Sequence, residues 1–315
     1  MREQGVTRVR TYFQGVDPLL FSPFVRAGHR AVARPEFSGG GARATVTAAG
    51  SAAGDAAEEE PFVIFSGGKL EYRKGQDIVV AAFRLFAAAH PAARLLVAWD
   101  NRYADALGTM TLSPHTVGAP SYYAHALDRP DVLSWLAANG VPRALVQDAG
   151  PLRREDVPAV LARADVALFT NRAEGGTNLV AMETVASGLP TVLSASTGHL
   201  DLLSVCGDGC IALRNQTVHT EVDALQTGGS GVLRYGWTDS DVGEVVAALE
   251  AVYADPSGAR ARAAAAAAAM QRDWPWSRHL AALAADMEAA GVLPRLSSAP
   301  ASPRGDDRAT TASSA

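Results

Sequence analysis

The chain has 315 residues, of which 48% are hydrophobic, and 28 Lys and Arg residues stand against 33 Asp and Glu residues. The hydrophobic content allows a large buried core. The slight excess of acidic over basic residues, without any run of basic residues, argues against a nucleic-acid partner. The first residues, MREQGVTRVR, lack the apolar region of a secretory signal. Arg84 interrupts the best membrane-span candidate, IVVAAFRLFAAAH, so we expect no transmembrane segment and a cytoplasmic protein.

Composition changes at both ends of the chain. Residues 38–60 are rich in Gly, Ala and Ser, end in acids and lack an apolar period, which predicts a flexible linker. Residues 291–315 end in LSSAPASPRGDDRATTASSA, which is typical of a disordered tail. We therefore expect the folded domain over residues 61–290.

Short apolar runs alternate with helical patterns inside this region. Residues 62–68 predict a strand closed by glycines, and residues 76–90 predict a helix because Val79, Phe83 and Phe86 recur at helical spacing. Further strands are expected over residues 94–99, 143–150, 164–170 and 189–195. Further helices are expected over residues 154–164, from near Leu179, over 241–253 and in two later segments, one of them alanine-rich at 263–269. Apolar strands that alternate with helices predict a parallel sheet covered on both faces, an α/β, Rossmann-like, doubly wound fold.

Two details of this pattern concern the ends of helices. Residues 101–142 are longer than a strand–helix connection needs, so we expect an insertion that ends in the short helix DVLSWLAANG. Thr238 and Asp241 form a start similar to a capping box for the helix over residues 241–253.

Cys206 and Cys210 are the two cysteines of the chain, and His199 and His219 flank them. These residue types permit a zinc hypothesis, but their spacing fits no standard zinc motif. We interpret the cysteines as two small, half-buried thiols in a Gly-containing loop, and we expect no metal site.

The stretch ALFTNRAEGGTNLVAME carries a candidate ligand site. A strand ends there, Gly175 and Gly176 let the backbone come close to a ligand, and Thr177 or Asn178 is expected to cap a helix beginning near Leu179. Because no acid occupies the first turn of that helix, its amides are open to an incoming phosphate.

Glu183 then falls in the second turn of this helix, among Leu, Val and Met neighbours. An unpaired carboxylate there costs several kcal/mol unless hydroxyl or amide donors meet it, and the vicinal hydroxyls of a ribose would be suitable donors. A core acid bonded to protein donors is the alternative interpretation.

The loop SGGKLEYRKGQD follows the first predicted strand and contains Lys69, Arg73 and Lys74 between glycines. These cations could hold a diphosphate whose negative charge grows as it leaves. The loop fits neither the dinucleotide nor the P-loop motif, which disfavours a dinucleotide-dependent dehydrogenase, and a solvated turn is the alternative interpretation.

Taken together, the two loops resemble those of the retaining GT-B glycosyltransferases of family 4, also called glycosyl transferases group 1. The residues that carry the resemblance are Gly68-Lys69-Leu70, Lys74-Gly75, Glu174, Glu183 and the helix stop ASGLP. It covers residues 62–276, where DWPWS is similar to the aromatic helix that ends the family's domain. Upstream, VTRVRTYFQGVDPLLFSP looks like the family's interdomain linker, so residues 1–37 are expected to be a remnant of that linker or of an amino-terminal domain.

The resemblance implies transfer of a sugar from a nucleotide-diphosphate sugar to an unknown acceptor, with retention at the anomeric carbon and with no metal or other cofactor. It implies that the catalytic residues are Lys69, Lys74 and Glu174. It also implies that the donor is bound by Gly68, Gly175, Gly176, Thr177, Asn178, Leu179 and Glu183. In this assignment the lysines hold the diphosphate, Glu174 contacts the sugar hydroxyls and Glu183 binds the ribose.

This chain departs from the family pattern at two points. Eight residues separate Glu174 from Glu183, where the family has seven, so the Gly-Gly loop carries one extra residue. Lys69 replaces the more common Arg, which keeps the charge but loses the bidentate fork.

GT-B catalysis takes place between two Rossmann-like domains, and the amino-terminal one holds most of the acceptor. About sixty residues precede the first predicted strand here. We therefore expect a single carboxyl-terminal GT-B domain with most of the amino-terminal domain missing, which another chain could supply. The alternatives are a non-catalytic nucleotide-sugar-binding module, a truncated fragment without independent activity, and a sugar-nucleotide epimerase that also needs both halves.

Overall fold

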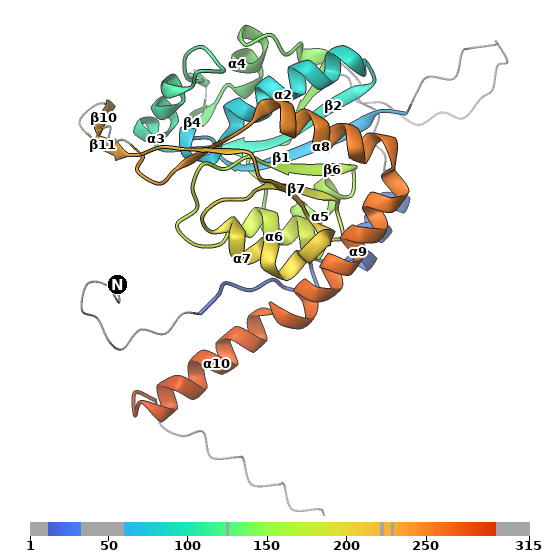
Figure 1. Ribbon diagram of the computed structural model, residues 1–315, viewed down its shortest axis with the longest axis vertical. Coiled ribbons are helices and arrows are strands. Elements are labelled where there is room, and N and C mark those ends of the chain that lie inside the picture. Colours follow the sequence, from blue (N-terminus) through green and yellow to red (C-terminus); the bar gives the residue numbers. More distant parts are fainter. Residues whose placement is uncertain (1–11, 33–59, 124–125, 221–223, 228–229, 294–315) are drawn as a thin grey trace, which may run out of the picture. The chain divides into compact units, whose positions relative to one another are not determined.

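The computed structural model describes residues 12–32, 60–123, 126–220, 224–227 and 230–293 (Figure 1). The chain divides into two compact units, Met1–His279 and Leu280–Ala315. The first unit contains the sheet and the sites considered below. The second contains the later part of helix α10 (Trp276–Ala289). In the part of the chain that is described, no helix has the length and apolarity to cross a membrane.

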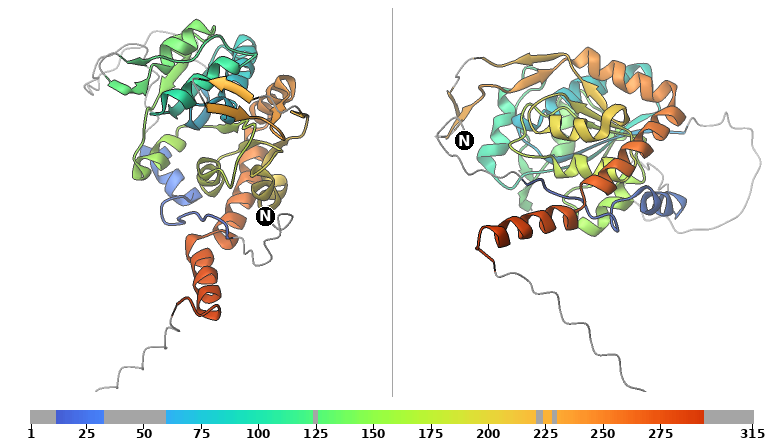
Figure 2. Two further views of the ribbon diagram at one scale, coloured as in Figure 1. Left: turned by 90° about the vertical axis from the view of Figure 1, so that its left-hand side faces the viewer. Right: turned by 60° about the horizontal axis from the view of Figure 1, so that its bottom comes forward.

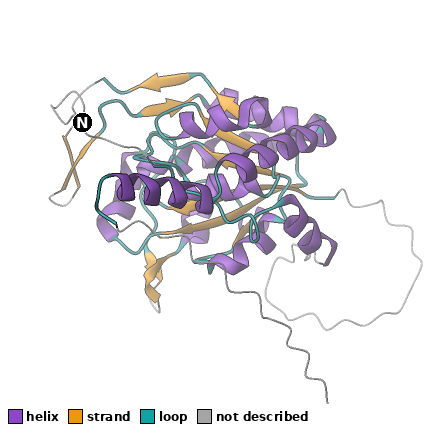
Figure 3. Cartoon of the chain, turned by 90° about the horizontal axis from the view of Figure 1, so that it is seen from below, coloured by secondary structure: helices purple, strands orange, loops and turns teal. Residues whose placement is uncertain are grey.

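A six-stranded parallel sheet forms the centre of the first unit, with helices on either side of it (Figure 3). Its order is β5-β2-β1-β6-β7-β8. The strands are β1 (Phe62–Lys69), β2 (Ala93–Asp100), β5 (Val146–Asp148), β6 (Val166–Phe169), β7 (Thr191–Ser194) and β8 (Ile211–Leu213). The chain runs outward from β1 to β5 and then returns to place β6 on the other side of β1. Ligands of open α/β sheets bind at such a reversal, beyond the carboxyl ends of the strands.

Helices cover both faces of the sheet, as Figures 1 and 2 show. One face packs against α2 (Gln76–Ala89), α4 (Val132–Ala138) and α8 (Val242–Ala254). The other packs against α5 (Val157–Leu161), α6 (Leu179–Ala186), α7 (His199–Cys206) and the later part of α9 (Pro256–Asp273). This arrangement confirms the predicted α/β, doubly wound, parallel sheet.

The burial of β1 explains why its sequence is apolar throughout. Ile64 packs in the hydrophobic cluster on one face, whereas Val63 and Phe65 pack in the cluster on the other. Successive side chains of a strand point to opposite faces, so a strand covered on both sides needs apolar residues at every position.

Several predicted boundaries were too wide. Residues Arg143–Leu145 form a 3₁₀ turn before β5, and the acids before α5 lie in a second 3₁₀ turn, Arg154–Asp156. Helix α7 and strand β8 were not predicted. Both are short, and the glycines between them interrupt any period that the sequence could display.

The predicted insertion contains α3 (Ala104–Gly108), the 3₁₀ turn Thr109–Leu112 and the antiparallel pair β3 (Tyr122–Tyr123) and β4 (Ala126–Pro130). It ends in α4, whose first turn is capped by the Asp131 side chain, an acceptor from the Ser134 amide at 3.0 Å. The predicted short helix is thus confirmed.

A second insertion, between β8 and α8, was not predicted. It consists of two antiparallel pairs, β9 (Gln216–Val218) with β12 (Thr238–Ser240) and β10 (Ala224–Thr227) with β11 (Ser230–Leu233). Asp241 caps α8 as expected, because its side chain accepts from the Glu244 amide at 2.8 Å. Thr238 does not share in this cap, since it lies in β12.

The segment expected to be an interdomain linker pairs with the start of α10. The Val16 amide donates to the Trp274 carbonyl at 2.9 Å, and the Trp276 amide donates to the Val16 carbonyl at 3.1 Å. The Phe13 ring stacks on the Trp274 ring with centroids 4.9 Å apart. Helix α1 (Pro23–Val32) follows. The linker predicted at 38–60 and the tail predicted at 291–315 lie almost entirely outside the described residues.

Candidate functional site

A cavity of about 290 Å³ opens at the carboxyl edge of the sheet, where the strand order reverses. The ends of β1 and β2, the turn after β5 and helix α6 form its walls. Gly68, Lys69 and Glu183 all line it. The fold therefore brings together three predicted site residues from the two loops that the resemblance singled out.

Gly68 and Lys69 occupy the end of β1. Gly68 has a φ of 121°, in the region that favours glycine, and a Cβ atom there would have no neighbour within 4 Å. Lys69 is exposed, and its ammonium lies 5.6 Å from the centroid of the Tyr103 ring. Lys69 forms no ion pair with any described residue, and it lines the cavity together with Asp100 and Glu183, so its ammonium can contact an anion that enters there.

Glu183 lies in the second turn of α6, as predicted, and its side chain is half-buried. Its carboxylate has no hydrogen bond or ion pair to any residue in the described ranges. Burial raises the pKa of Glu183 to about 7, against the opposing charge of Arg154. The structure therefore gives no support to the alternative of a core acid satisfied by protein donors.

This raised pKa predicts an unusual pH dependence for Glu183→Gln. The folded state holds the proton more tightly than the unfolded chain, so Glu183 costs no stability below its ordinary pKa of 4.5 and an increasing amount as pH rises to about 7. We expect the glutamine variant to match the wild type near pH 4.5. At pH 8 we expect the glutamine variant to be more stable than the wild type by about 1 to 2 kcal/mol. A pKa shift of this size corresponds to roughly 3 kcal/mol for a fully buried group, and contact of the half-buried side chain with solvent reduces that free energy.

Urea denaturation of both proteins at the two pH values measures this difference. A difference between variant and wild type that stays the same at pH 4.5 and pH 8 would contradict the assignment of an unpaired carboxyl to Glu183.

Asn178 caps α6, which begins at Leu179 as predicted. Its Oδ1 atom accepts from the Ala181 amide at 3.3 Å. Thr177 does not cap the helix, because its hydroxyl donates to Gln14 Oε1 at 3.1 Å. No acid lies in the first turn of α6, so the amides of that turn keep the positive end of the helix dipole open to an anion.

His199, which sequence reasoning considered for zinc alone, holds this cap in place. The orientation of the Asn178 amide is fixed by the Ala181 bond, so its Nδ2 atom donates to His199 Nε2 at 3.1 Å. His199 Nδ1 then carries the proton and donates to the Ser194 carbonyl at 3.2 Å. Burial lowers the pKa of His199 to about 4, against the charge of Glu174, so the ring is neutral at physiological pH.

Glu174 is paired with cations from the other loop. It accepts from Lys74 Nζ at 2.5 Å, from Arg73 Nη1 at 3.1 Å and from the Asn171 side chain. Its side chain is 6% exposed. Burial alone would raise the pKa of Glu174, but Lys74 together with neighbouring cations holds that pKa below its usual value. The fold thus brings Lys74 into an ion pair with Glu174, which was not predicted, and neither residue lines the cavity that holds Lys69 and Glu183.

Gly175 and Gly176 form the exposed tip of this loop, and a Cβ atom on either would have no neighbour within 4 Å. The backbone of this loop instead comes close to the backbone at Gly198, where a Cβ atom would lie 1.5 Å from the Gly176 carbonyl oxygen. Gly198 was not predicted, because the sequence does not reveal which loop meets it.

Arg172 is the main site residue that sequence reasoning missed. Its guanidinium and the Asp77 carboxylate are fully buried and form two hydrogen bonds of 2.7 Å. Arg172 also bonds the Asp239 carboxylate, donates to the Tyr72 carbonyl at 2.6 Å and lies 3.7 Å from the centroid of the Tyr72 ring. This network, which we call the Arg172 cluster, joins the loops that carry Lys74 and Glu174. Nothing in the sequence singled out Asp77 as a site residue, because acids are common in the first turn of a helix.

No group of three His, Cys, Asp or Glu side chains that could hold a metal occurs within the ranges described. Cys206 and Cys210 are free thiols, and both are buried rather than half-buried. His219 bonds Asp239 through Nε2 at 2.8 Å. The expectation of half-buried thiols in a loop was therefore wrong as to burial, and Cys206 is the last residue of α7.

Comparison with known proteins identifies the fold and the family. The model of the family described as "Family 4 Glycosyltransferase in conflict systems" matches residues 14–283. No curated protein matches the chain. Among solved structures, sucrose-phosphate synthase from Thermosynechococcus elongatus has a TM-score of 0.59 and 18% identity, over 91% of this chain and 54% of that one. HepE from Anabaena, in complex with UDP and glucose, has a TM-score of 0.56 and 15% identity, over 91% of this chain and 59% of that one.

A third structure is the C-terminal domain of the glycosyl transferase group 1 protein LpcC from Francisella tularensis. Its TM-score is 0.51 at 12% identity, over 83% of this chain and 99% of that domain. This chain thus spans a little more than half of the first two structures and nearly all of the third. The family model covers most of the chain, so the chain belongs to the family 4 glycosyltransferases of conflict systems, and the solved structures show that it has the fold of GT-B glycosyltransferases.

Proposed function

We propose that this chain binds the nucleotide-diphosphate sugar of a retaining glycosyltransferase, which transfers the sugar to an acceptor without a metal. The observation that carries the proposal is Glu183, a half-buried carboxyl that has no partner among the described residues and shares a cavity with the cation of Lys69. A ribose diol would donate two hydrogen bonds to the Glu183 carboxylate and would compensate the cost of keeping it charged.

The diphosphate would lie between Lys69 and the first turn of α6. No acid lies in the first turn of α6, and Lys69 forms no ion pair with a described residue, although Asp100 also lines the cavity. Negative charge develops on the diphosphate as the bond to the sugar breaks, so fixed positive charge there stabilises the transition state more than the bound donor. HepE was crystallised with UDP-glucose, which supports a nucleotide sugar as the donor class.

Lys74 and Glu174 would act next to this diphosphate. Lys74 donates to Glu174 at 2.5 Å, and this contact helps to keep Glu174 charged in the absence of a ligand. We propose that Lys74 turns to the diphosphate when the donor binds, and that Glu174 then accepts hydrogen bonds from the sugar hydroxyls. Gly175 and Gly176 would supply amides to the sugar or the phosphate.

Lys69→Ala tests the diphosphate part of the proposal. Lys69 is exposed and has no ion pair in the described ranges, so we expect the free energy of unfolding to change by less than about 0.5 kcal/mol. Loss of a charge-assisted bond should weaken the affinity for a nucleoside diphosphate about tenfold. Calorimetric titration measures the affinity, and Arg153→Ala, in an exposed pair, is the control for lost charge. Equal affinity in wild type and Lys69→Ala would remove Lys69 from the site.

A nucleotide-sugar-binding module without transfer activity is the second candidate. The chain covers 99% of the C-terminal domain of LpcC, a domain that was crystallised by itself. Incubation with a bound nucleotide sugar separates the two candidates. Release of nucleoside diphosphate on addition of an acceptor or of a partner domain supports transfer, whereas tight binding without turnover supports the module.

A further inference from the structure

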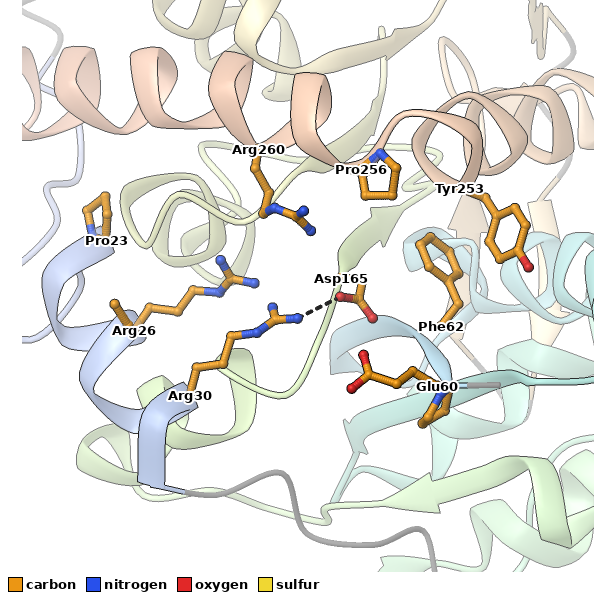
Figure 4. A pocket seen from close by; sticks show the side chains of 11 residues that line it. Pro23, Arg26, Arg30, Glu60, Phe62, Asp165, Tyr253, Pro256 and Arg260 are labelled. Atoms are coloured by element: carbon orange, nitrogen blue, oxygen red, sulfur yellow. Dashed lines mark hydrogen bonds and ion pairs between the residues drawn. The ribbon is translucent and has the colours of Figure 1, made fainter. Parts of the chain in front are cut away.

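A second cavity, of about 650 Å³, opens at the amino edge of the same sheet. Phe62, the first residue of β1, and Asp165, the residue before β6, lie in its floor (Figure 4). The remaining walls come from α1 and from the junction of α8 with α9. The cavity shares no residue with the one that holds Lys69 and Glu183.

Three guanidinium groups point into this cavity: those of Arg26 and Arg30 on α1 and that of Arg260 on α9 (Figure 4). Arg26 is 8% exposed and donates to backbone carbonyls, with Nη2 at 2.7 Å from the Ala164 oxygen. The burial of Arg26, together with the charges of Arg30 and Arg260, lowers its pKa to about 10, against the charge of Asp165. Backbone carbonyls thus fix this cation without neutralising it.

Two carboxylates, Asp165 and Glu60, line the cavity with the three guanidinium groups, which leaves one positive charge in excess. Both oxygens of Asp165 are occupied, because Oδ1 accepts from Arg30 Nη2 at 3.0 Å and Oδ2 accepts from the Val63 amide at 3.0 Å. The Arg260 guanidinium donates to the Ser257 hydroxyl at 3.5 Å and forms no ion pair with a residue of the described ranges.

We propose that this pocket binds a phosphate group between Arg26, Arg30 and Arg260. The planar donor forks of arginine match the oxygens of a phosphate, and the positive charge in excess of the two carboxylates favours an anion. Phe62 and Tyr253 provide an aromatic wall beside the cations. The volume lies within the range of small-molecule sites, so the group can belong to free phosphate or to a small phosphomonoester.

Calorimetric titration with inorganic phosphate and with phenyl phosphate, at constant ionic strength, tests the proposal. The proteins are the wild-type chain, Arg260→Ala, Arg262→Ala and Lys69→Ala. Arg260 is exposed, so its loss should leave the fold intact, and circular dichroism checks this. Arg262 is the matched control, because it lies on the same helix, outside the cavity, with Asp255 at 3.8 Å as its partner.

We expect Arg260→Ala to bind about tenfold more weakly than wild type, whereas Arg262→Ala keeps the wild-type affinity. Lys69→Ala removes the cation of the nucleotide site, so phosphate that binds there is weakened by Lys69→Ala and not by Arg260→Ala, and either assignment can fail without the other. Tighter binding of phenyl phosphate than of phosphate assigns a phosphomonoester, and equal binding assigns free phosphate. Absence of binding at millimolar ligand, or equal affinity in Arg260→Ala and wild type, would overturn the proposal.

Discussion

Replacement of Arg172 with leucine is expected to lower the free energy of unfolding by about 3 to 5 kcal/mol. Arg172 and Asp77 are both fully buried, so removal of the guanidinium leaves the Asp77 carboxylate without its main partner in a dry interior. The Ser113 hydroxyl at 2.8 Å is the donor that remains to Asp77. The Tyr72 carbonyl loses one of its two donors and keeps the Gly75 amide at 3.1 Å.

Urea denaturation of Arg172→Leu and wild type measures this loss. Arg153→Ala is the control, because Arg153 pairs with Asp156 at 2.9 Å while its side chain is 74% exposed. Such exposed pairs contribute about 0 to 1 kcal/mol. A double variant with Asp77→Leu should recover part of the stability, since the buried charge is then gone. A loss below about 1 kcal/mol in the single variant would show that the Arg172 cluster does not hold the loops.

Gly75→Ala is expected to destabilise the fold by about 3 kcal/mol or more. Gly75 has a φ of 71°, and a Cβ atom there would lie 2.0 Å from the Thr170 carbonyl oxygen. Thr170 also donates its hydroxyl to the Gly75 carbonyl at 2.7 Å, so the two backbones cannot separate without loss of that bond. Because Lys74 precedes Gly75, the same change should displace the lysine from Glu174 and weaken nucleotide binding.

Gly175→Ala is the matched control for this prediction. Gly175 lies in the facing loop, has no positive φ and would place its Cβ atom in open space. Its substitution should change the free energy of unfolding by less than about 0.5 kcal/mol. Similar unfolding midpoints for Gly75→Ala and wild type in urea would contradict the close approach of β6 and the Lys74 loop.

Much of the fold could be predicted because buried positions are occupied by apolar residues, which the sequence shows directly. Strand β1 is buried on both faces and is apolar at each of Phe62, Val63, Ile64 and Phe65. The pairs between β8 and α8 could not be predicted, because they are short and leave no period. A helix or strand can be recognised in the sequence when it is long enough to show a periodic pattern of apolar residues.

The candidate site was partly predictable for a different reason. Glu183 is a carboxyl in an apolar helical turn, and Asn178 precedes a helix without an acid in its first turn, so both depart from local expectation. Arg172 and His199, in contrast, are not unusual for their positions among their sequence neighbours. Their roles depend on partners distant in sequence, Asp77 and Asn178, which are brought into contact by the fold.

The central claim is that Glu183 binds the ribose of a nucleotide sugar. Calorimetric titration of the wild-type chain and Glu183→Gln with UDP, GDP, ADP and their glucose or mannose conjugates tests it most directly. The account predicts that one nucleotide series binds the wild type and that Glu183→Gln, though folded and more stable at pH 8, binds it at least about tenfold more weakly. Undiminished affinity in Glu183→Gln, or no binding of any of these ligands to the folded wild type, would contradict the account.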